Sequence, residues 1–336
     1  MKRIFVLAMV VSFFGVVGIF SETSVAAPIT IRFSSSMPVH NFMTKQCIEW
    51  GKLVEQYSGG ELKVQIFDSA QLYKDPELPK ALQTGAVDAG ITGSLFLGPA
   101  LISAMRVFQM PFLFQTVDEM AKVYRSKVGD AWKTEAEKKG VKLMGLVVHP
   151  SPEDQLIATI KPVKVPADLK GMTIRVGGPD DAVVFKKWGA APSFIPGMDV
   201  YPALQRGTLQ GALGSVTNQV ELKRYEVAPY AVFMPMAGAQ AYYGMNKGFF
   251  DKLTPKQQKA IVDASEAMER RTKFMTMEAL AVAMEQLKKV MKGLYTTTPQ
   301  EMAQWREGIT ELWPQLVGDN KELADALKAT RAILGK

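Results

Sequence analysis

Cysteine and histidine are scarce in this sequence. Its 336 residues contain one cysteine, Cys47, and two histidines, His40 and His149. One cysteine excludes an intramolecular disulfide and a multi-cysteine metal site, and two histidines leave few ligands for zinc. The sequence also lacks the Gly-x-Ser-x-Gly elbow, the His-Glu-x-x-His pair, a phosphate-binding glycine loop and the dinucleotide fingerprint. These absences argue against an enzyme, a metal site and a bound cofactor.

Charge of one sign is not concentrated anywhere along the chain. Lysine and arginine number 40 against 33 acidic residues, which gives a formal net charge of +7. The basic residues occur in scattered pairs such as Lys138-Lys139, without the stripe that binding to a phosphate backbone requires. We therefore expect no nucleic-acid partner. Hydrophobic residues make up 47% of the chain, enough for a large core in one elaborate domain or two lobes.

The N-terminus has the layout of a secretory signal peptide. Lys2 and Arg3 precede an uncharged apolar run, Ile4–Phe20, and small residues follow it. We expect a signal peptide over residues 1–26, cleaved after Ala26 or, as second choice, after Ala27. The alternative is an uncleaved membrane anchor, because the run approaches the lower length limit of about 17 residues for a spanning helix. The preferred interpretation is an exported periplasmic protein.

Short β-rich runs alternate with helical patterns through the first half of the chain. This alternation predicts an α/β fold with largely parallel sheets, whose ligands bind beyond the carboxyl ends of the strands. Helices should begin at Asp75-Pro76, Thr254-Pro255 and Thr298-Pro299, where a capping oxygen precedes proline. The predicted strands are Ile29–Ser34, Leu62–Phe67, Ala86–Ile91, Leu143–Val148 and Thr173–Val176.

A short internal repeat suggests two similar lobes. The segment Ala81–Ala89, with the sequence ALQTGAVDA, recurs as Ala203–Gly211, with the sequence ALQRGTLQG. Both read as a helix, a glycine that ends it and a buried strand. Two related α/β lobes with a cleft between them, and helices from Thr254 onward packed across both, would explain the repeat.

The arginine of the run Met172–Gly178 is the most informative polar residue. Strands of a parallel sheet covered on both faces are usually apolar, so Arg175 near the end of such a strand requires an anion. Its planar guanidinium can hold a carboxylate through two parallel hydrogen bonds. An internal salt bridge to an aspartate or glutamate is the alternative, and strand position alone leaves both open.

Other cleft candidates follow the ends of predicted strands. Polar residues also occupy such loops because loops face water, and Met37 precedes proline and could simply pack. His40 receives no catalytic role, because a lone loop histidine is commonly a surface residue. The candidates are Met37 and His40 in the loop Ser34–Phe42, Gln71, Thr92, Ser94, Ser215 and Asn218.

Several ordered segments resemble one known family. They are Val54–Gly60, Ala70–Leu72, Leu82–Asp88, Met110–Phe114, Asp168–Val176 and Val200–Gly207. On these segments the chain resembles the solute-binding proteins of tripartite ATP-independent periplasmic (TRAP) transporters, of the DctP type.

The resemblance implies a periplasmic binding protein fold in which two α/β lobes enclose a ligand cleft and a long helix from Pro255 bridges them. It implies that Arg175 clamps the carboxylate of a small organic acid, that no cofactor is needed and that the partner is a TRAP membrane permease. We expect residues 27–150 and 238–275 in lobe I, and 151–237 and 276–336 in lobe II.

Three positions depart from the pattern of the family. Where the family commonly has a second arginine, this chain has Asp154. An aromatic residue of the family aligns near Gly197, and an asparagine of the family aligns with Gly214. The two glycines would enlarge the pocket, and Asp154 would remove a second anchor for a dianion. We therefore expect a larger monocarboxylate, or an amino-bearing acid paired with Asp154. The alternative functions are a binding protein of an ATP-driven importer or sensor, and a periplasmic enzyme acting on a small carboxylic acid.

Overall fold

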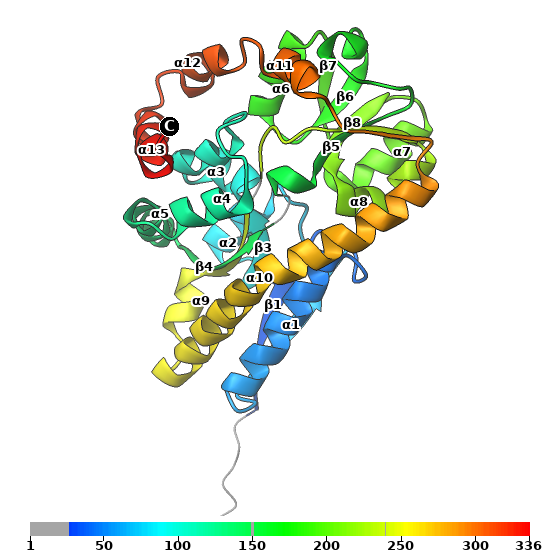
Figure 1. Ribbon diagram of the computed structural model, residues 1–336. Helices are drawn as coiled ribbons and strands as arrows, with labels where there is room; N and C mark the ends of the chain where they lie inside the picture. The colour runs from blue at the N-terminus through cyan, green and yellow to red at the C-terminus, as the bar shows by residue number, and fades with distance from the viewer. Residues whose placement is uncertain (1–26, 149–150, 239) are drawn as a thin grey trace, which may run out of the picture.

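The computed structural model describes residues 27–148, 151–238 and 240–336. The predicted signal peptide and His149 lie outside the described residues. The chain forms two lobes, each built on one β-sheet flanked by helices (Figure 1). The two-lobed α/β architecture predicted from the repeat is therefore confirmed. No helix in the described part of the chain is both long enough and apolar enough to cross a membrane.

The sheet of lobe I has five strands in the order β2-β1-β3-β10-β4. β1, β2 and β3 run parallel, and β10 is antiparallel to both of its neighbours. The strands span Ile29–Ser34 (β1), Leu62–Phe67 (β2), Ala89–Gly93 (β3), Val141–Val148 (β4) and Gln240–Asn246 (β10).

The sheet of lobe II repeats this order and adds one strand, giving β11-β9-β5-β8-β6-β7. β7, β6 and β8 run parallel, and β5 is antiparallel to β8 and β9. Each sheet is thus mixed rather than largely parallel, because the chain crosses between lobes and returns in the opposite direction. The strands span Gln155–Thr159 (β5), Thr173–Val176 (β6), Ala191–Phe194 (β7), Gly211–Ser215 (β8), Tyr230–Phe233 (β9) and Gly293–Tyr295 (β11).

Helices cover the faces of both sheets. In lobe I they are α1 (Phe42–Tyr57), α2 (Leu78–Thr84), α3 (Ser94–Ala100), α4 (Val117–Tyr124), α5 (Lys127–Lys138) and α9 (Lys247–Asp251), with the 3₁₀ segment η1 (Ser103–Gln109). In lobe II they are α6 (Pro179–Lys187), α7 (Val200–Gln205), α8 (Val216–Glu221) and α11 (Pro299–Arg306), with η5 (Arg224–Glu226). The chain ends with α12 (Trp313–Val317) and α13 (Lys321–Leu334).

The internal repeat has the structure that its sequence predicts. Gly85 follows α2 with φ of 76°, and Gly207 follows α7 with φ of 72°, a left-handed conformation that glycine adopts without steric cost. β3 and β8 follow as buried strands. β1 pairs Ser34 with Gly90, and β6 pairs Arg175 with Ala212, the residue that corresponds to Gly90 in the repeat. Arg175 therefore occupies in lobe II the place of Ser34 in lobe I.

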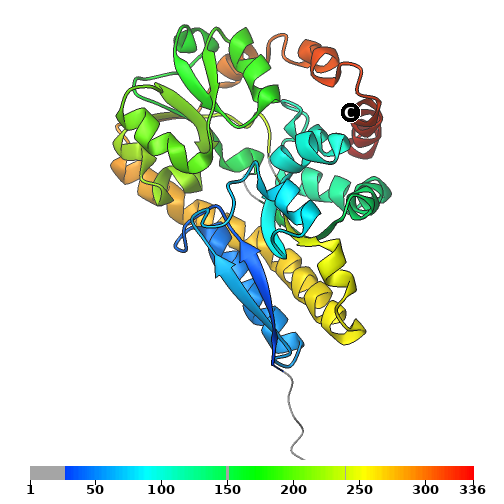
Figure 2. The ribbon, with the colours of Figure 1, turned by 180° about the vertical axis from the view of Figure 1, so that it is seen from behind.

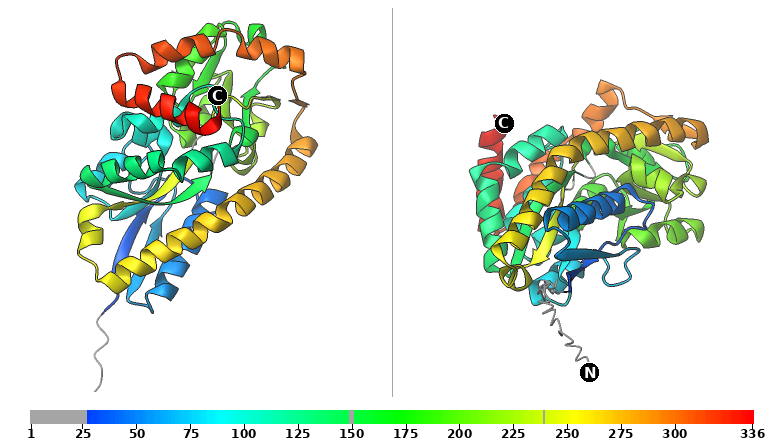
Figure 3. Two further views of the ribbon diagram at one scale, coloured as in Figure 1. Left: turned by 60° about the vertical axis from the view of Figure 1, so that its left-hand side comes forward. Right: turned by 90° about the horizontal axis from the view of Figure 1, so that it is seen from below.

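The helix α10 (Pro255–Val290) runs along both lobes (Figure 3). Its first half buries residues such as Ile261 in the core of lobe I, and its second half buries residues such as Leu287 in lobe II. The capping oxygen predicted at its start is present and belongs to a full capping box, since the side chain of Thr254 accepts a hydrogen bond from the Gln257 amide and the Gln257 side chain accepts one from the Thr254 amide.

The C-terminal residues require a correction to the expected lobes. We expected residues 276–336 in lobe II, but α13 packs against η1, α4 and α5 of lobe I (Figure 2). Its buried Leu323 joins the same hydrophobic core as Met120 of α4. The Lys336 ammonium donates to the Leu113 carbonyl oxygen at 2.8 Å. The chain thus returns to lobe I, where the apolar face of α13 packs against the hydrophobic core.

Two local predictions are also corrected. The helix expected from Asp75-Pro76 begins later, at Leu78, and Glu77 precedes it without a side-chain cap. The strand expected from Ala86 begins at Ala89, because Asp88 turns back to bind Arg32 of β1 through two hydrogen bonds of 2.9 Å.

We predict that Thr254→Ala lowers the free energy of unfolding by about 0.5 to 2 kcal/mol, because the first turn of α10 loses its cap. Denaturant unfolding measures the change. The exposed Thr296 provides the control, and Thr296→Ala should stay within about 0.5 kcal/mol of the wild type. Equal effects of both variants would contradict a specific role of the cap.

Candidate functional site

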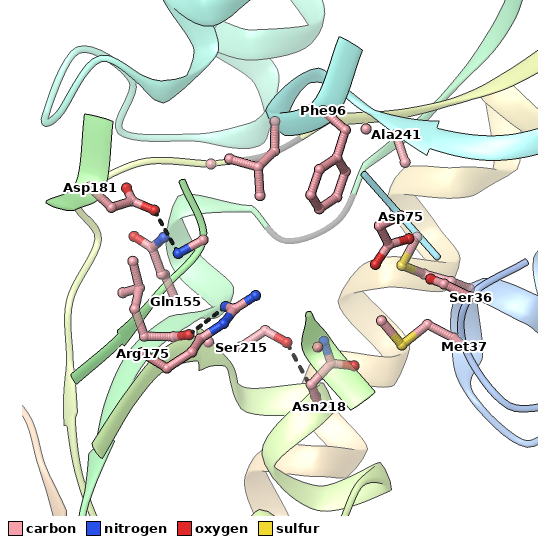
Figure 4. Close-up of a pocket in the computed structure, with 18 of the residues that line it drawn as sticks. Ser36, Met37, Asp75, Phe96, Gln155, Arg175, Asp181, Ser215, Asn218 and Ala241 are labelled. Atoms are coloured by element: carbon pink, nitrogen blue, oxygen red, sulfur yellow. Dashed lines mark hydrogen bonds between the residues drawn. The ribbon is translucent and has the colours of Figure 1, made fainter. Parts of the chain in front are cut away.

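A cavity of about 150 Å³ lies between the lobes, a size similar to the roughly 150 Å³ engineered cavity that holds a benzene-sized molecule (Figure 4). It is formed where the carboxyl ends of β1, β3, β6 and β8 face one another, the position expected for ligands of α/β sheets. Its polar lining comprises Ser36, Asp75, Gln109, Gln155, Arg175, Asp181, Ser215, Asn218 and Arg224.

Arg175 lies at the end of β6 with its guanidinium on the cavity wall (Figure 4). Nε donates to the Ile195 carbonyl oxygen at 3.2 Å and Nη1 donates to the Leu213 carbonyl oxygen at 3.0 Å. These bonds fix the plane of the guanidinium and do not use Nη2. No carboxylate of the described residues forms an ion pair with it. Burial lowers the pKa of Arg175, although Asp181 and Asp75 act to raise it.

Two aspartates that sequence reasoning missed also line the cavity. Asp181, in the first turn of α6, accepts a hydrogen bond from the Gly177 amide at 3.1 Å. Burial, with a smaller contribution from Asp180, raises the pKa of Asp181 to about 6. Asp75 lies across the cavity, and burial raises its pKa despite a hydrogen bond from Ser36. Because the Asp75-Pro76 pair resembles a helix cap, its sequence pattern did not indicate a place in the cavity.

A second arginine, also missed, reaches the cavity from η5. The Nη2 atom of Arg224 donates to the Gly197 carbonyl oxygen at 2.6 Å. The side chain is 3% exposed, and burial, followed by repulsion from Arg175, lowers its pKa to about 9. We expected Gly197 and Gly214 to enlarge the pocket, but the Arg224 guanidinium lies beside both of them. The expectation that the pocket lacks a second cation is therefore wrong.

Five of the ten predicted site residues line the cavity. Ser215 is the N-cap of α8, and its Oγ accepts a hydrogen bond from the Asn218 amide at 3.1 Å (Figure 4). β8 ends at Ser215, so α8 begins at the cavity. The five are Met37, Arg175, Gly197, Ser215 and Asn218.

Asp154 and Thr92 are buried but do not line the cavity. The Asp154 carboxylate accepts hydrogen bonds from the amide and hydroxyl of Thr217, at 3.3 and 3.2 Å, and so holds the start of α8 in place. The expected pairing of Asp154 with a ligand amine is therefore not supported by its position. Thr92 points to the opposite face of β3 from its neighbours Ile91 and Gly93, which do line the cavity.

His40, Gln71 and Ser94 also lie outside the cavity wall. The exposed His40 contacts the Glu221 carbonyl oxygen through Nε2 at 3.2 Å. Gln71 is exposed and donates to Asp68 at 2.9 Å. Ser94 accepts a hydrogen bond from Gln109 at 3.3 Å and supports that lining residue from behind. A loop after a strand can face away from the cleft, and the sequence pattern does not distinguish the two orientations.

The lobes contact each other on both sides of the cavity. Glu221 of α8 accepts hydrogen bonds from the Asn41 side chain at 2.6 Å and from the Phe42 amide at 3.1 Å, both at the start of α1. On the other side, Arg106 of η1 pairs with Asp180 of α6 at 2.5 Å. The structure is therefore closed around the cavity.

Nothing in the described residues groups three or more histidine, cysteine or acidic side chains as a metal site would require. The single cysteine, Cys47, is buried in the core of lobe I, where burial raises the pKa of its thiol. The site therefore offers hydrogen bonds and charge, and its most direct chemistry is the binding of a small anion.

Comparison with known proteins gives consistent matches. The family "Bacterial extracellular solute-binding protein, family 7" (DctP) matches residues 33–319. The C4-dicarboxylate-binding periplasmic protein DctP of Rhodobacter capsulatus is 26% identical over 326 residues, covering 93% of this chain and 94% of its own length.

Solved structures match over most of the chain as well. A TRAP periplasmic solute-binding protein from Sulfurospirillum deleyianum with bound succinate is 25% identical with a TM-score of 0.80, covering 91% of this chain and 99% of its own. One from Sulfitobacter sp. NAS-14.1 with bound β-D-galacturonate is 21% identical with a TM-score of 0.83, covering 90% and 99%. The chain belongs to family 7 of the bacterial extracellular solute-binding proteins, the DctP family of TRAP solute-binding proteins.

Proposed function

We propose that this protein captures a small organic acid in the periplasm by pairing the acid's carboxylate with Arg175, and that it delivers the acid to a TRAP membrane permease. The observation that carries the proposal is the Arg175 guanidinium, held at the cavity wall by the carbonyl oxygens of Ile195 and Leu213 and not ion-paired with any carboxylate of the described residues. A carboxylate in the cavity would supply the missing anion.

The ligands named for relatives support this class of substrate. The Rhodobacter protein is described as binding C4-dicarboxylates, and the Sulfurospirillum structure holds succinate. Each of these ligands carries a carboxylate. The proposed delivery to a permease rests on membership of the family, and the proposed export with cleavage near Ala26 rests on the N-terminal sequence pattern, rather than on the geometry of the cavity.

Capture requires that the lobes separate and close. In this structure the cavity wall comes from both lobes, which are joined by the contacts of Glu221 with Asn41 and of Arg106 with Asp180, and these contacts break when the lobes separate. A bound acid contacts both lobes and therefore binds the closed state more tightly than the open state. This difference in affinity shifts the protein toward closure. Closure also excludes water, which strengthens the charge interaction with Arg175. No covalent bond changes in this cycle.

The first prediction from the proposed function concerns Arg175. Arg175→Ala should weaken binding of the acid that co-purifies with the protein, identified by native mass spectrometry, by about thirty-fold to several thousand-fold. Truncating one partner of a buried charge pair costs about 2 to 5 kcal/mol. Arg175→Lys should also weaken binding, because a point charge cannot reproduce the planar fork. Titration calorimetry measures both, with the exposed Arg206→Ala as control. Unchanged affinity in the alanine variant would overturn the proposal.

The second prediction concerns closure. Glu221→Gln should weaken ligand binding by about three- to thirty-fold, because hydrogen bonds to a charged group contribute about 1.5 to 3 kcal/mol and part of this is retained by glutamine. Small-angle scattering should show a more open ligand-free protein. Glu226→Gln is the matched control, since Glu226 bonds Tyr201 within the same lobe. A similar loss in both variants would argue against an interlobe latch.

The third prediction concerns pH. Asp181, with a pKa of about 6, is mostly ionised at pH 7.5 and repels an anionic ligand, whereas at pH 5.5 it is mostly protonated. The titration uses an acid whose carboxyl groups all have pKa values of about 4 or below, so that the ligand stays ionised across this range. Affinity should therefore rise about three- to ten-fold from pH 7.5 to 5.5, which corresponds to roughly 1 kcal/mol of repulsion. Asp181→Asn should remove most of this dependence, and the exposed Asp319→Asn should leave it intact.

A further inference from the structure

Arg224 is a buried cation with few partners. It begins η5 directly after Lys223, and it contacts the cavity from lobe II. Nη2 donates to the Gly197 carbonyl oxygen, but Nε is buried and has no hydrogen-bond partner among the residues that the structure describes. A buried polar group without a partner costs free energy, and a buried charge costs more. The site is therefore incomplete as the protein alone forms it.

The backbone around Arg224 is shaped to admit its guanidinium. A Cβ atom on Gly214 would lie 3.3 Å from Nη1, and one on Gly197 would lie 3.8 Å from Nη2. Any side chain longer than alanine at either position would compete with the guanidinium for the same space. The two glycines thus allow an arginine from a different element to reach the cavity between them.

The acidic residues of the cavity do not neutralise Arg224. Asp75 and Asp181 both act to raise the pKa of Arg175, whereas burial and repulsion from Arg175 lower the pKa of Arg224. No carboxylate in the described parts of the chain lies within ion-pair distance of Arg224. Two guanidinium groups therefore face one cavity, and only Arg175 has acidic neighbours to compensate it.

We propose that Arg224 is a second anion anchor, so that the ligand carries two anionic groups, one for each arginine. The inference rests on the proposed function, since it assumes that Arg175 holds the first carboxylate. A cavity of about 150 Å³ limits the ligand to a small dianion. Arg224 then determines specificity by discriminating a dianion from the monoanion of the same size, because an acid with one charge leaves a buried guanidinium unpaired.

The test uses matched pairs of acids in which a methyl group or hydrogen replaces one carboxylate. The pairs are succinate and butyrate, malate and 3-hydroxybutyrate, and phthalate and benzoate, each titrated calorimetrically into the mature protein freed of co-purified ligand. We expect at least one dianion to bind about thirty-fold or more tightly than its monoanionic partner.

Variants at position 224 identify the residue responsible. Arg224→Met should lower affinity for that dianion by about thirty-fold or more and change monoanion affinity less than about three-fold, whereas Arg224→Lys should restore part of the preference. Lys223→Met, which removes one exposed charge next to it, should leave the preference unchanged. Circular dichroism and thermal unfolding establish that each variant is folded.

The outcomes separate this inference from the proposed function. If monoanions bind as tightly as dianions and depend on Arg175 but not on Arg224, the second anchor is wrong and capture through Arg175 stands. If a dianion binds best but Arg224→Met keeps the preference, Arg224 is not the anchor. If no acid of the panel binds the wild type, the inference of a small dianion is overturned.

Discussion

Arg175 cannot lose its proton at any ordinary pH, and it lies where water is largely replaced by protein. The protein holds its guanidinium with two backbone carbonyl oxygens and leaves the acidic side chains Asp75 and Asp181 at a distance. Full pairing with either aspartate would satisfy the arginine and abolish its use for an external anion. The proposed binding depends on this charge remaining available.

The internal repeat explains how such a position arises. Both lobes carry three parallel strands in the same order, and in both a strand ends at the cavity and continues into a helix. At equivalent places the two lobes differ, with Ser34 in lobe I and Arg175 in lobe II. Lobe II thus supplies both arginines of the cavity, and lobe I supplies other lining residues such as Asp75 and Phe96.

The long helix and the C-terminal segment connect binding in the cavity to the whole molecule. α10 is part of the cores of both lobes, and α13 returns to lobe I after α11 has packed on lobe II. Movement of one lobe against the other must therefore be accommodated by these connections, while the contacts of Glu221 and Arg106 across the cavity form and break. Ligand binding is coupled to closure because the cavity wall is complete only when the lobes meet.

The sequence alone predicted the elements whose signals are local. The helix starts at Thr254 and Thr298, the glycine that ends each repeat helix and Arg175 in an apolar strand depend on neighbours within a few residues, and the family resemblance placed them in one architecture. The sequence did not reveal that Arg224 reaches the cavity between Gly197 and Gly214, or that Asp154 faces α8 instead. Those contacts join residues that are distant along the chain. Which side chains share the cavity is therefore decided only by the tertiary structure, in which the chain crosses between the two lobes.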